Sequence, residues 1–394
     1  MDLDEIVWLL TPEGARAVEQ ARADLDAGVA VHTIAERLRG AYGAPQSRAA
    51  LALVAGRISA AAKFADAAHL FLDREAAEQA TAEVVARWTA RRFAGAGLVA
   101  DLGCGAGGDA LALAEVASVL AVDRDSARVA MARANAAVRN LGARLEVREG
   151  DALDPLPPEV DAVWLDPSRR DGSGRTLDPA AWSPPLAEAL RVASTVARAG
   201  IKAAPGLDLV HAPEGGEVEF ISHHGGLVEA VLWLGEAVSA PRRATVLPQG
   251  VSVAGEPDTG ATPVGESGRY LFDLDASVGR ASLVDVVAPG LEAWRLDGRT
   301  AYLSGNAPVA SPFARRFRIL ESMPFAERRL RNVVRALGAA RVEVMRRASP
   351  VDTNALERRL NAALSGAGPV LTVALTRTGG AHTALVCVRE RDDG

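Results

Sequence analysis

Glycine occupies four of the nine positions in the stretch Asp101-Leu-Gly-Cys-Gly-Ala-Gly-Gly-Asp109, and this turn constrains the fold more than any other feature. The turn follows a short apolar run at residues 98–102 and precedes a helical pattern at 109–116. The backbone must turn sharply here, and it lacks side chains at Gly103, Gly105 and Gly107. A ligand can therefore lie directly against the backbone. The stretch therefore predicts a strand, a turn and a helix, with a ligand at the turn.

The alternation of strand and helix continues beyond this turn. Residues 126–140 predict a second helix, and further strands are predicted by the apolar runs at 119–122, 145–147 and 160–165. This order is typical of parallel strands joined by right-handed crossovers. Two later runs, at 218–222 and 227–234, flank a glycine-containing turn and predict an antiparallel hairpin at the sheet edge. The predicted fold class is α/β, a doubly wound and mostly parallel sheet with an antiparallel edge hairpin.

Acidic residues follow three of the predicted strands. Asp123 ends the second strand, where a carboxylate can accept hydrogen bonds from both hydroxyls of a ribose, in NAD or in S-adenosylmethionine alike. Asp151 and Ala152 follow the third strand, where an Asp side chain and an adjacent backbone amide can read an adenine edge. Asp166-Pro167 follows the fourth strand, over the expected position of a cofactor's reactive end. The last two features and the edge hairpin favour a methyltransferase over a dehydrogenase.

Residues 98–170 resemble the class I S-adenosylmethionine-dependent methyltransferases, with VADLGCGAGGDA and VWLDPSRR as the matching segments. The sheet pattern extends the resemblance to about residue 240, and implies a Rossmann-like methyltransferase fold. The resemblance implies S-adenosylmethionine as cofactor, bound by Asp101, Gly103, Gly105, Gly107, Asp123, Asp151, Ala152 and Asp166. Cys104, inside the turn, is interpreted as a small residue and not as a nucleophile.

The Asp-Pro pair resembles the (Asp/Asn)-Pro-Pro-aromatic signature of amino-group methyltransferases, including the trimethylguanosine synthase-like enzymes. The implied mechanism is direct methyl transfer from the sulfonium, in which orientation contributes on the order of several kcal/mol. An acceptor amine would donate hydrogen bonds to the Asp166 carboxylate and the Pro167 carbonyl, which localises its lone pair and stabilises developing positive charge. Asp166 and Pro167 are therefore the predicted catalytic residues.

The sequence departs from that signature where an aromatic ring would stack on a target base. Ser168 and Arg169 occupy the matching positions. The Arg169 guanidinium could stack or hold a phosphate, or Trp182 could supply a ring from the next segment. Each remaining candidate has a structural alternative, a salt bridge for Arg169 and Arg170 and a structural ion pair for Lys202. The predicted substrate-binding residues are Ser168, Arg169, Arg170, Trp182 and Lys202.

The whole chain is similar to bacterial methyltransferases that carry a ferredoxin-like segment and a C-terminal THUMP-like domain. This resemblance predicts a helical N-terminal domain at 1–94, a methyltransferase domain at 95–240, a linker and ferredoxin-like segment at 241–334 and a THUMP-like domain at 335–394. The N-terminal domain is expected to contain an amphipathic helix at 63–72 and another at 73–93, capped by Asp73. Glycine, proline, threonine and serine mark 241–268 as a linker or long loops, and 282–287 is expected to be helical.

Charge distribution bears on the partner. The formal net charge is -6, with 42 arginines and only two lysines, yet residues 311–350 hold ten arginines against three acidic residues. THUMP-type domains are associated with RNA binding, so RNA is the expected partner and an unpaired or flipped base amine the expected acceptor. The basic segment would then bind phosphates.

Other features indicate the setting. Two cysteines far apart, Cys104 and Cys387, cannot form a disulfide framework, and a cytoplasmic location fits this usage. No apolar run approaches the ~20 residues that span a membrane, and no metal site is expected, because the adjacent His223 and His224 lack accompanying ligands. Two alternatives stay open: a small-molecule or protein methyltransferase of this fold, and a non-catalytic RNA-binding protein.

Overall fold

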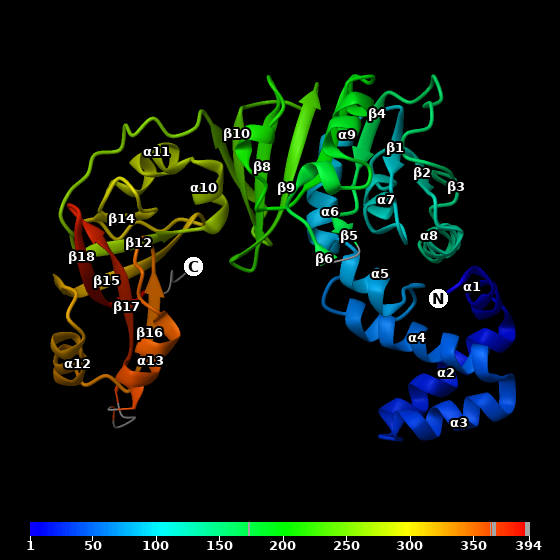
Figure 1. Cartoon of the computed structure of the whole chain (residues 1–394), viewed down its shortest axis with the longest axis horizontal. Helices are drawn as coiled ribbons and strands as arrows, with labels where there is room; N and C mark the ends of the chain where they lie inside the picture. Colours follow the sequence, from blue (N-terminus) through cyan, green and yellow to red (C-terminus); the bar gives the residue numbers. More distant parts are fainter. Residues whose placement is uncertain (172–173, 363, 365–367, 391–394) are drawn as a thin grey trace. The chain divides into compact units, whose positions relative to one another are not determined.

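The computed structural model describes residues 1–171, 174–362, 364 and 368–390 (Figure 1). The chain forms two compact units. The first contains residues 1–217 and 229–239, and the second contains 218–228 and 240–394.

The first unit is built on a mostly parallel sheet, with strands in the order β9-β7-β4-β1-β2-β3. The first four adjacent pairs from the β3 side are parallel, and β9 runs antiparallel to β7. The strands are β1 (Leu98–Leu102), β2 (Ser118–Asp123), β3 (Leu145–Glu149), β4 (Ala162–Leu165), β7 (Arg198–Ala203) and β9 (Gly226–Gly235). Three helices connect them, α7 (Gly108–Leu113), α8 (Ser126–Val138) and α9 (Leu186–Ala193). The predicted doubly wound α/β fold is confirmed.

Aromatic rings fill the centre of this sheet. Phe93, Trp164 and Trp233 lie with ring centroids 5.8 to 6.1 Å apart, and all three are buried. Gly200 on β7 makes room for them, since a Cβ atom there would lie 2.7 Å from the Trp233 ring and 2.8 Å from Trp164. With few other aromatics available, most of the remaining core is Ala, Val and Leu.

Helices form the N-terminal part of the same unit. They are α1 (Leu3–Leu9), α2 (Pro12–Asp26), α3 (Val31–Tyr42), α4 (Ala44–Ala60), α5 (Arg74–Gln79), α6 (Glu83–Ala90) and the 3-10 turn Arg91–Phe93. Asp73 caps α5 as predicted, because its carboxylate accepts from the Ala76 amide at 2.8 Å. The predicted helix at 73–93 is interrupted, however, since Ala80 adopts an extended ψ of 139°.

The prediction of a helix at 63–72 is wrong. These residues form turns, because their backbone groups are bonded elsewhere. The Phe71 amide donates to the Asn135 side chain, and the carbonyls of His69 and Leu70 accept from the Arg57 guanidinium.

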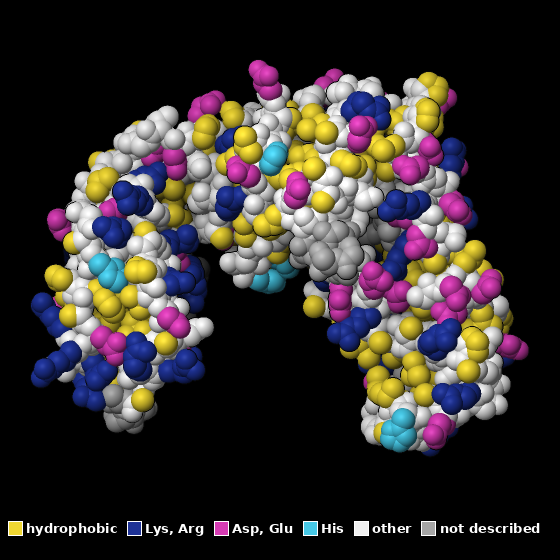
Figure 2. All heavy atoms as spheres, in the orientation of Figure 1, with side chains coloured by type: hydrophobic (Ala, Val, Ile, Leu, Met, Phe, Trp, Pro, Cys, Tyr) yellow, Lys and Arg dark blue, Asp and Glu magenta, His cyan; other side chains and the backbone are white. Residues whose placement is uncertain are grey.

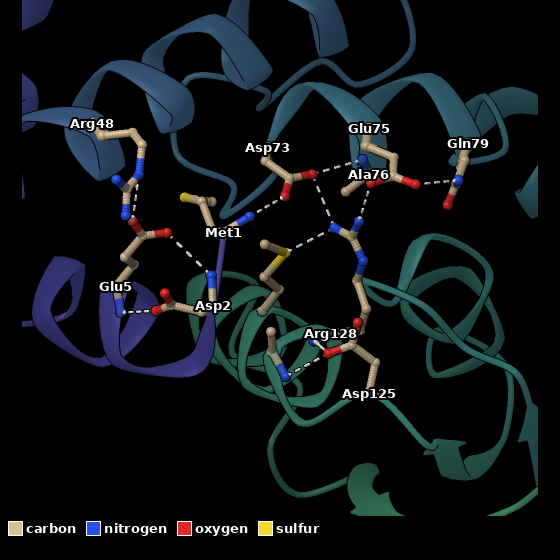
Figure 3. Close-up of polar contacts among 12 residues, drawn as sticks. Met1, Asp2, Glu5, Arg48, Asp73, Glu75, Ala76, Gln79, Asp125 and Arg128 are labelled. Atoms are coloured by element: carbon tan, nitrogen blue, oxygen red, sulfur yellow. Dashed lines mark hydrogen bonds and ion pairs between the residues drawn. The ribbon is translucent and has the colours of Figure 1, made fainter. Parts of the chain in front are cut away.

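Polar contacts tie the start of α5 to α8 (Figure 3). Arg128 of α8 donates to Asp73 at 2.9 Å and to Glu75 at 3.3 Å. Beside these contacts, Phe64, Leu70 and Leu72 share an apolar cluster with Ala106 of the glycine-rich turn and Met131 of α8. The N-terminal helical segment therefore packs directly on the glycine-rich turn.

The second unit holds a short group of strands and a larger sheet. Strand β10 (Arg242–Leu247) pairs parallel with β8 (Glu217–His223) and antiparallel with β11 (Val251–Gly255). The prediction that the hairpin containing residues 218–222 lies at the sheet edge is wrong, because β10 pairs with β8. The prediction of loops across 241–268 is therefore wrong for its first part. Its glycines and prolines lie mainly around the strands, whereas the Ala244, Val246 and Leu247 side chains are buried.

The larger sheet has seven strands in the order β13-β14-β12-β15-β18-β17-β16. Their bounds are β12 (Tyr270–Leu274), β13 (Ala293–Arg295), β14 (Tyr302–Gly305), β15 (Ala314–Pro324), β16 (Arg341–Arg346), β17 (Val370–Thr378) and β18 (Ala381–Arg389). The helices of this unit are α10 (Ala276–Ala281), α11 (Val284–Val287), α12 (Glu327–Ala336) and α13 (Thr353–Asn361), with a 3-10 turn at Pro289–Leu291. The predicted helix at 282–287 is shorter, because Ser282 is left-handed, with φ of 56°.

This sheet crosses the expected boundary at residue 334/335. Strand β15 lies before that boundary, yet it pairs along most of its length with β18, which lies after it. The ferredoxin-like segment and the THUMP-like domain of the prediction thus share one sheet. No helix within the described ranges is both long and apolar enough to cross a lipid bilayer.

Candidate active site

A pocket of about 630 Å³ opens where the carboxyl ends of the parallel strands meet in the first unit. The predicted site residues that line it are Gly103, Gly105, Asp123, Asp151, Ala152, Asp166, Pro167, Ser168 and Arg169. Because strands β1 to β4 are parallel, residues more than 60 positions apart reach one edge of the sheet. The sequence prediction thus brings most of its residues to one cavity.

The glycine-rich turn forms one wall of the pocket. Its three predicted glycines are all left-handed, with φ of 87° at Gly103, 54° at Gly105 and 91° at Gly107. A Cβ atom at Gly103 would lie 3.2 Å from the Asp166 carbonyl oxygen, and one at Gly107 would lie 3.3 Å from Ala132. Apart from its neighbours in the chain, no described residue has an atom within 4 Å of a Cβ at Gly105, so this space is open. Gly107 serves the packing of the turn on α8, and Gly105 faces free space.

Asp123 holds this turn in place. One of its carboxylate oxygens accepts from the Gly105 amide at 2.8 Å, and the other accepts from the Asp125 amide at 2.9 Å. On the far side of the pocket, Asp151 accepts from the Leu153 amide at 2.9 Å and closes a turn after β3. Both carboxylates are therefore oriented by backbone amides before any ligand arrives.

Asp101 lies outside the pocket wall and is completely buried. Neither of its carboxyl oxygens has a hydrogen-bond partner among the described residues. Burial raises the pKa of Asp101 well above its usual range, and the nearby Asp109 and Asp166 raise it further. Its surroundings at the end of β1, next to the turn, therefore disfavour the ionised form of this carboxyl group.

Asp166 is held by a cation that does not itself line the pocket. Lys202 is 5% exposed, and its ammonium donates to Asp166 Oδ2 at 2.8 Å and to Thr81 Oγ1 at 2.5 Å. Burial alone would lower the pKa of Lys202, but Asp109, Asp166 and Glu229 outweigh it and raise that pKa. Lys202 is accordingly a buried ion-pair partner in this structure.

The remaining predicted substrate residues have different surroundings. The backbone of Ser168 pairs with that of Ser183, with N···O distances of 2.8 and 2.9 Å, and both residues line the pocket. Trp182, the residue before Ser183, is only 2% exposed and does not line the pocket. Its ring offers no face to a ligand there. Arg170 begins the strand β5 (Arg170–Asp171), which pairs with β6 (Gly174–Arg175), but its side chain lies outside the described part of the chain.

Several lining residues escaped the sequence prediction. Glu75, Gln79 and Thr81 come from the N-terminal helical segment, and Arg128 comes from α8. Asp109, the last residue of the glycine-rich stretch, accepts from Thr81 at 2.9 Å. Of these residues, only Asp109 could have been identified from the local sequence, since it opens a helix beside the turn. Glu75, Gln79, Thr81 and Arg128 reach the pocket only through tertiary packing.

Neither a cysteine nucleophile nor a metal centre is supported among the described residues. Burial raises the pKa of the Cys104 thiol well above its usual range, which disfavours the nucleophilic thiolate. No group of three or more His, Cys, Asp or Glu residues suited to a metal ion occurs in the described ranges.

The parallel sheet, the glycine-rich turn and the strand-end carboxylates define a Rossmann-like enzyme of the class I methyltransferase type. Family models match at two places, a methyltransferase domain over residues 99–170 and a THUMP domain-like region over 314–389. A relative in two strains of Mycobacterium tuberculosis, described as an uncharacterized S-adenosylmethionine-dependent methyltransferase, is 38% identical over 333 residues. The match covers 81% of this chain and 88% of the relative.

The chain belongs to the S-adenosylmethionine-dependent methyltransferases. A solved structure from Porphyromonas gingivalis W83, described as a methyltransferase, matches 100% of both chains with a TM-score of 0.74 at 19% identity, and so has the same fold. The pocket suits this cofactor, because the space beside Gly105 is open and preoriented carboxylates lie at the ends of β2 and β4. The cofactor supplies an activated methyl group on its sulfonium.

Proposed function

We propose that this methyltransferase transfers the methyl group to an exocyclic amine of an RNA base. The observation that carries the proposal is the Asp166-Pro167 pair, which follows β4 and lines the pocket. Asp166 is 28% exposed in its side chain, so one face of it is available to a substrate. An amine that donates to this carboxylate and to the Pro167 carbonyl would have its lone pair localised and aimed at the sulfonium.

Within this proposal, the cofactor residues have separate roles. Gly103 and Gly105 bring the backbone close to the methionine part of the cofactor, and Asp123 accepts from the ribose hydroxyls. Asp151 and Ala152 read the adenine edge. Asp101 and Gly107 act from behind the turn, the first through its buried carboxyl and the second through close packing on Ala132.

RNA as the partner is supported by the second unit. Arg328 and Arg329 on α12 and Arg358 on α13 are exposed, and Figure 2 shows basic side chains gathered over these two helices. Glu327 is the only acidic residue of α12, and it already accepts from Arg331 and Arg359. The two helices therefore carry more arginines than acidic residues, and this net positive charge suits a phosphate backbone. The THUMP domain-like match covers both helices.

Tritiated methyl transfer tests the proposal. Wild type and Asp166→Ala are incubated with labelled cofactor and, separately, total RNA, protein extract and small metabolites from cells lacking the enzyme. Label in RNA that disappears with Asp166→Ala, followed by nuclease digestion to an N-methylated nucleoside, is the expected result. Label confined to protein or metabolites would contradict the RNA assignment.

One observation favours a second candidate, a small-molecule or protein acceptor. No aromatic ring follows Asp166-Pro167, and Trp182 is buried away from the pocket. An acceptor that is not a flat base needs no stacking partner. Arg169 lines the pocket and could instead hold a carboxylate or phosphate of such an acceptor. The metabolite and protein arms of the same experiment test this candidate.

A further inference from the structure

We infer that Lys202 is the positioning residue for Asp166, and that Thr81 brings the N-terminal helical segment into this task. The inference rests on the proposed role of Asp166 as the hydrogen-bond acceptor for the substrate. It assigns a function to a residue that lies behind the pocket wall, and to a helical segment outside the methyltransferase family match.

The geometry around Lys202 is that of a fully occupied ammonium. Its three contacts are Thr81 Oγ1 at 2.5 Å, Asp166 Oδ2 at 2.8 Å and Asp109 Oδ2 at 3.4 Å. An ammonium has three donors, so each can be directed to one oxygen. No hydrogen bond from a described residue engages Asp166 Oδ1. Lys202 thus fixes one oxygen of the carboxylate and leaves the other for an amine in the pocket.

Four acidic residues from separate segments interact with this ammonium. Asp101 is on β1, Asp109 is on α7, Asp166 follows β4 and Glu229 is on β9. Burial raises the pKa of Glu229 to about 8, and it raises that of Asp101 as well. Asp109 and Asp166 are the two acidic side chains that the Lys202 ammonium contacts directly. A single cation serves both of them.

Thr81 owes its position to the break between α5 and α6. A continuous helix through 73–93 would carry the backbone on past Ala80, but the extended conformation of Ala80 turns the chain. Thr81 is 8% exposed, and its hydroxyl accepts from Lys202 while donating to Asp109 at 2.9 Å. The hydroxyl therefore orders the two ion-pair partners relative to each other. Valine at this position would keep the shape and lose both bonds.

The composition of the chain offers a direct test of these contacts, because Lys63 and Lys202 are its only lysines. With ¹⁵N-labelled lysine, the full-length protein gives two side-chain ammonium signals, assigned with Lys202→Arg. We expect Asp166→Asn and Thr81→Val each to shift the Lys202 signal. The Lys63 signal is the internal control, since its ammonium donates to the backbone carbonyls of Ala77, Glu78 and Ala80. An unchanged Lys202 signal in Asp166→Asn would overturn the inference.

Turnover is then measured on whichever pool takes label from the wild type. Lys202→Met should lower kcat at least about 100-fold, while the Kd for S-adenosylhomocysteine, measured by calorimetry, changes less than about threefold. Lys202→Arg should recover part of the loss, and Thr81→Val should lose less than Lys202→Met, with Thr81→Ser near wild type. The inference would be overturned if both Lys202→Met and Thr81→Val kept the wild-type kcat. It would also be overturned if Lys202→Met lost cofactor affinity to the same extent as kcat and had a lower melting temperature, since that would indicate a general structural role. If Lys202→Met does not fold, the kcat values of Thr81→Val and Lys202→Arg test the inference in its place.

The same variants separate this inference from the RNA assignment. Label in a pool other than RNA would overturn the RNA assignment alone, since the kcat values of the variants are then compared on that pool.

Discussion

The side-chain amide of Asn135 hydrogen-bonds both polar backbone atoms of Phe71. Its Oδ1 accepts from the Phe71 amide at 2.6 Å, and its Nδ2 donates to the Phe71 carbonyl at 3.2 Å. The same Nδ2 donates to the carbonyl of Ala106 in the glycine-rich turn at 2.9 Å. Asn135 is 1% exposed, so water cannot replace these bonds. One side chain of α8 thereby connects the N-terminal helical segment to the turn that lines the pocket.

We expect Asn135→Ala to lower the free energy of unfolding by about 2–4 kcal/mol, because it leaves buried backbone groups without partners. Urea denaturation followed by circular dichroism measures this change. Affinity for S-adenosylhomocysteine should fall with it, since Ala106 belongs to the pocket wall. The matched control is Asn354→Ala on α13, an exposed asparagine whose removal should change stability by less than about 0.5 kcal/mol. Similar stabilities for the two variants would contradict the role of Asn135.

The cofactor assignment of Asp123 leads to a second prediction. Asp123→Asn keeps the size of the side chain, but it leaves one acceptor oxygen for two backbone amides and removes the charge that would bind ribose hydroxyls. The Kd for S-adenosylhomocysteine should rise at least about tenfold, equivalent to about 1.4 kcal/mol. Glu146→Gln, an exposed carboxylate on β3 outside the pocket, is the control and should bind as the wild type does. Equal affinities for all three proteins would exclude Asp123 from the site.

Glu229 predicts a pH dependence of stability. Burial raises the pKa of its carboxyl to about 8 in the folded protein, whereas in the unfolded chain it stays near its ordinary value of 4.5. Between these values the folded state binds a proton that the unfolded state has lost. Stability must therefore fall as pH rises through this window, by up to about 1.4 kcal/mol per pH unit from this group. Glu229→Gln removes the effect.

Urea denaturation at pH 5, 6, 7 and 8 should show the difference in unfolding free energy between Glu229→Gln and the wild type growing with pH. Comparing the two proteins cancels the contributions of other titrating groups. Glu236→Gln, an exposed residue at the end of the same strand, provides the control and should follow the wild type at every pH. A difference that stays constant from pH 5 to pH 8 would show that Glu229 is ionised throughout.

The sequence predicted those parts of the site whose chemistry is local. A glycine-rich turn between a strand and a helix, and acids placed directly after strands, identify Gly105, Asp123 and Asp166 without knowledge of tertiary packing. Thr81 and Lys202 could not be paired in this way, because 121 positions separate them and neither lies in a recognisable motif. The break at Ala80 was equally hidden, since alanine favours a continuous helix.

Other differences have similarly specific causes. Trp182 is buried and does not line the pocket, whereas the next residue, Ser183, does, because its backbone pairs with that of Ser168. Residues 242–247 were obscured by the glycine and proline around them. Their pairing with both β8 and β11 makes them a strand despite two arginines at its start.

The basic face of α12 predicts salt-dependent RNA binding. Reversing two exposed charges with Arg328→Glu and Arg329→Glu should weaken binding of a short fluorescent single-stranded oligoribonucleotide at low salt at least about tenfold. If each arginine contacts one phosphate, the slope of log K against log salt concentration should become shallower by about 1.4. Fluorescence anisotropy across a salt series measures both the affinity and this slope.

The control is the pair Arg16→Glu and Arg39→Glu, at exposed positions of α2 and α3 in the first unit. This pair changes the net charge by the same amount and should leave RNA affinity nearly unchanged. Neither pair should alter the Kd for S-adenosylhomocysteine, because none of the four arginines lines the pocket. Equal weakening by both pairs would mean that net charge, and not the α12 face, governs RNA binding.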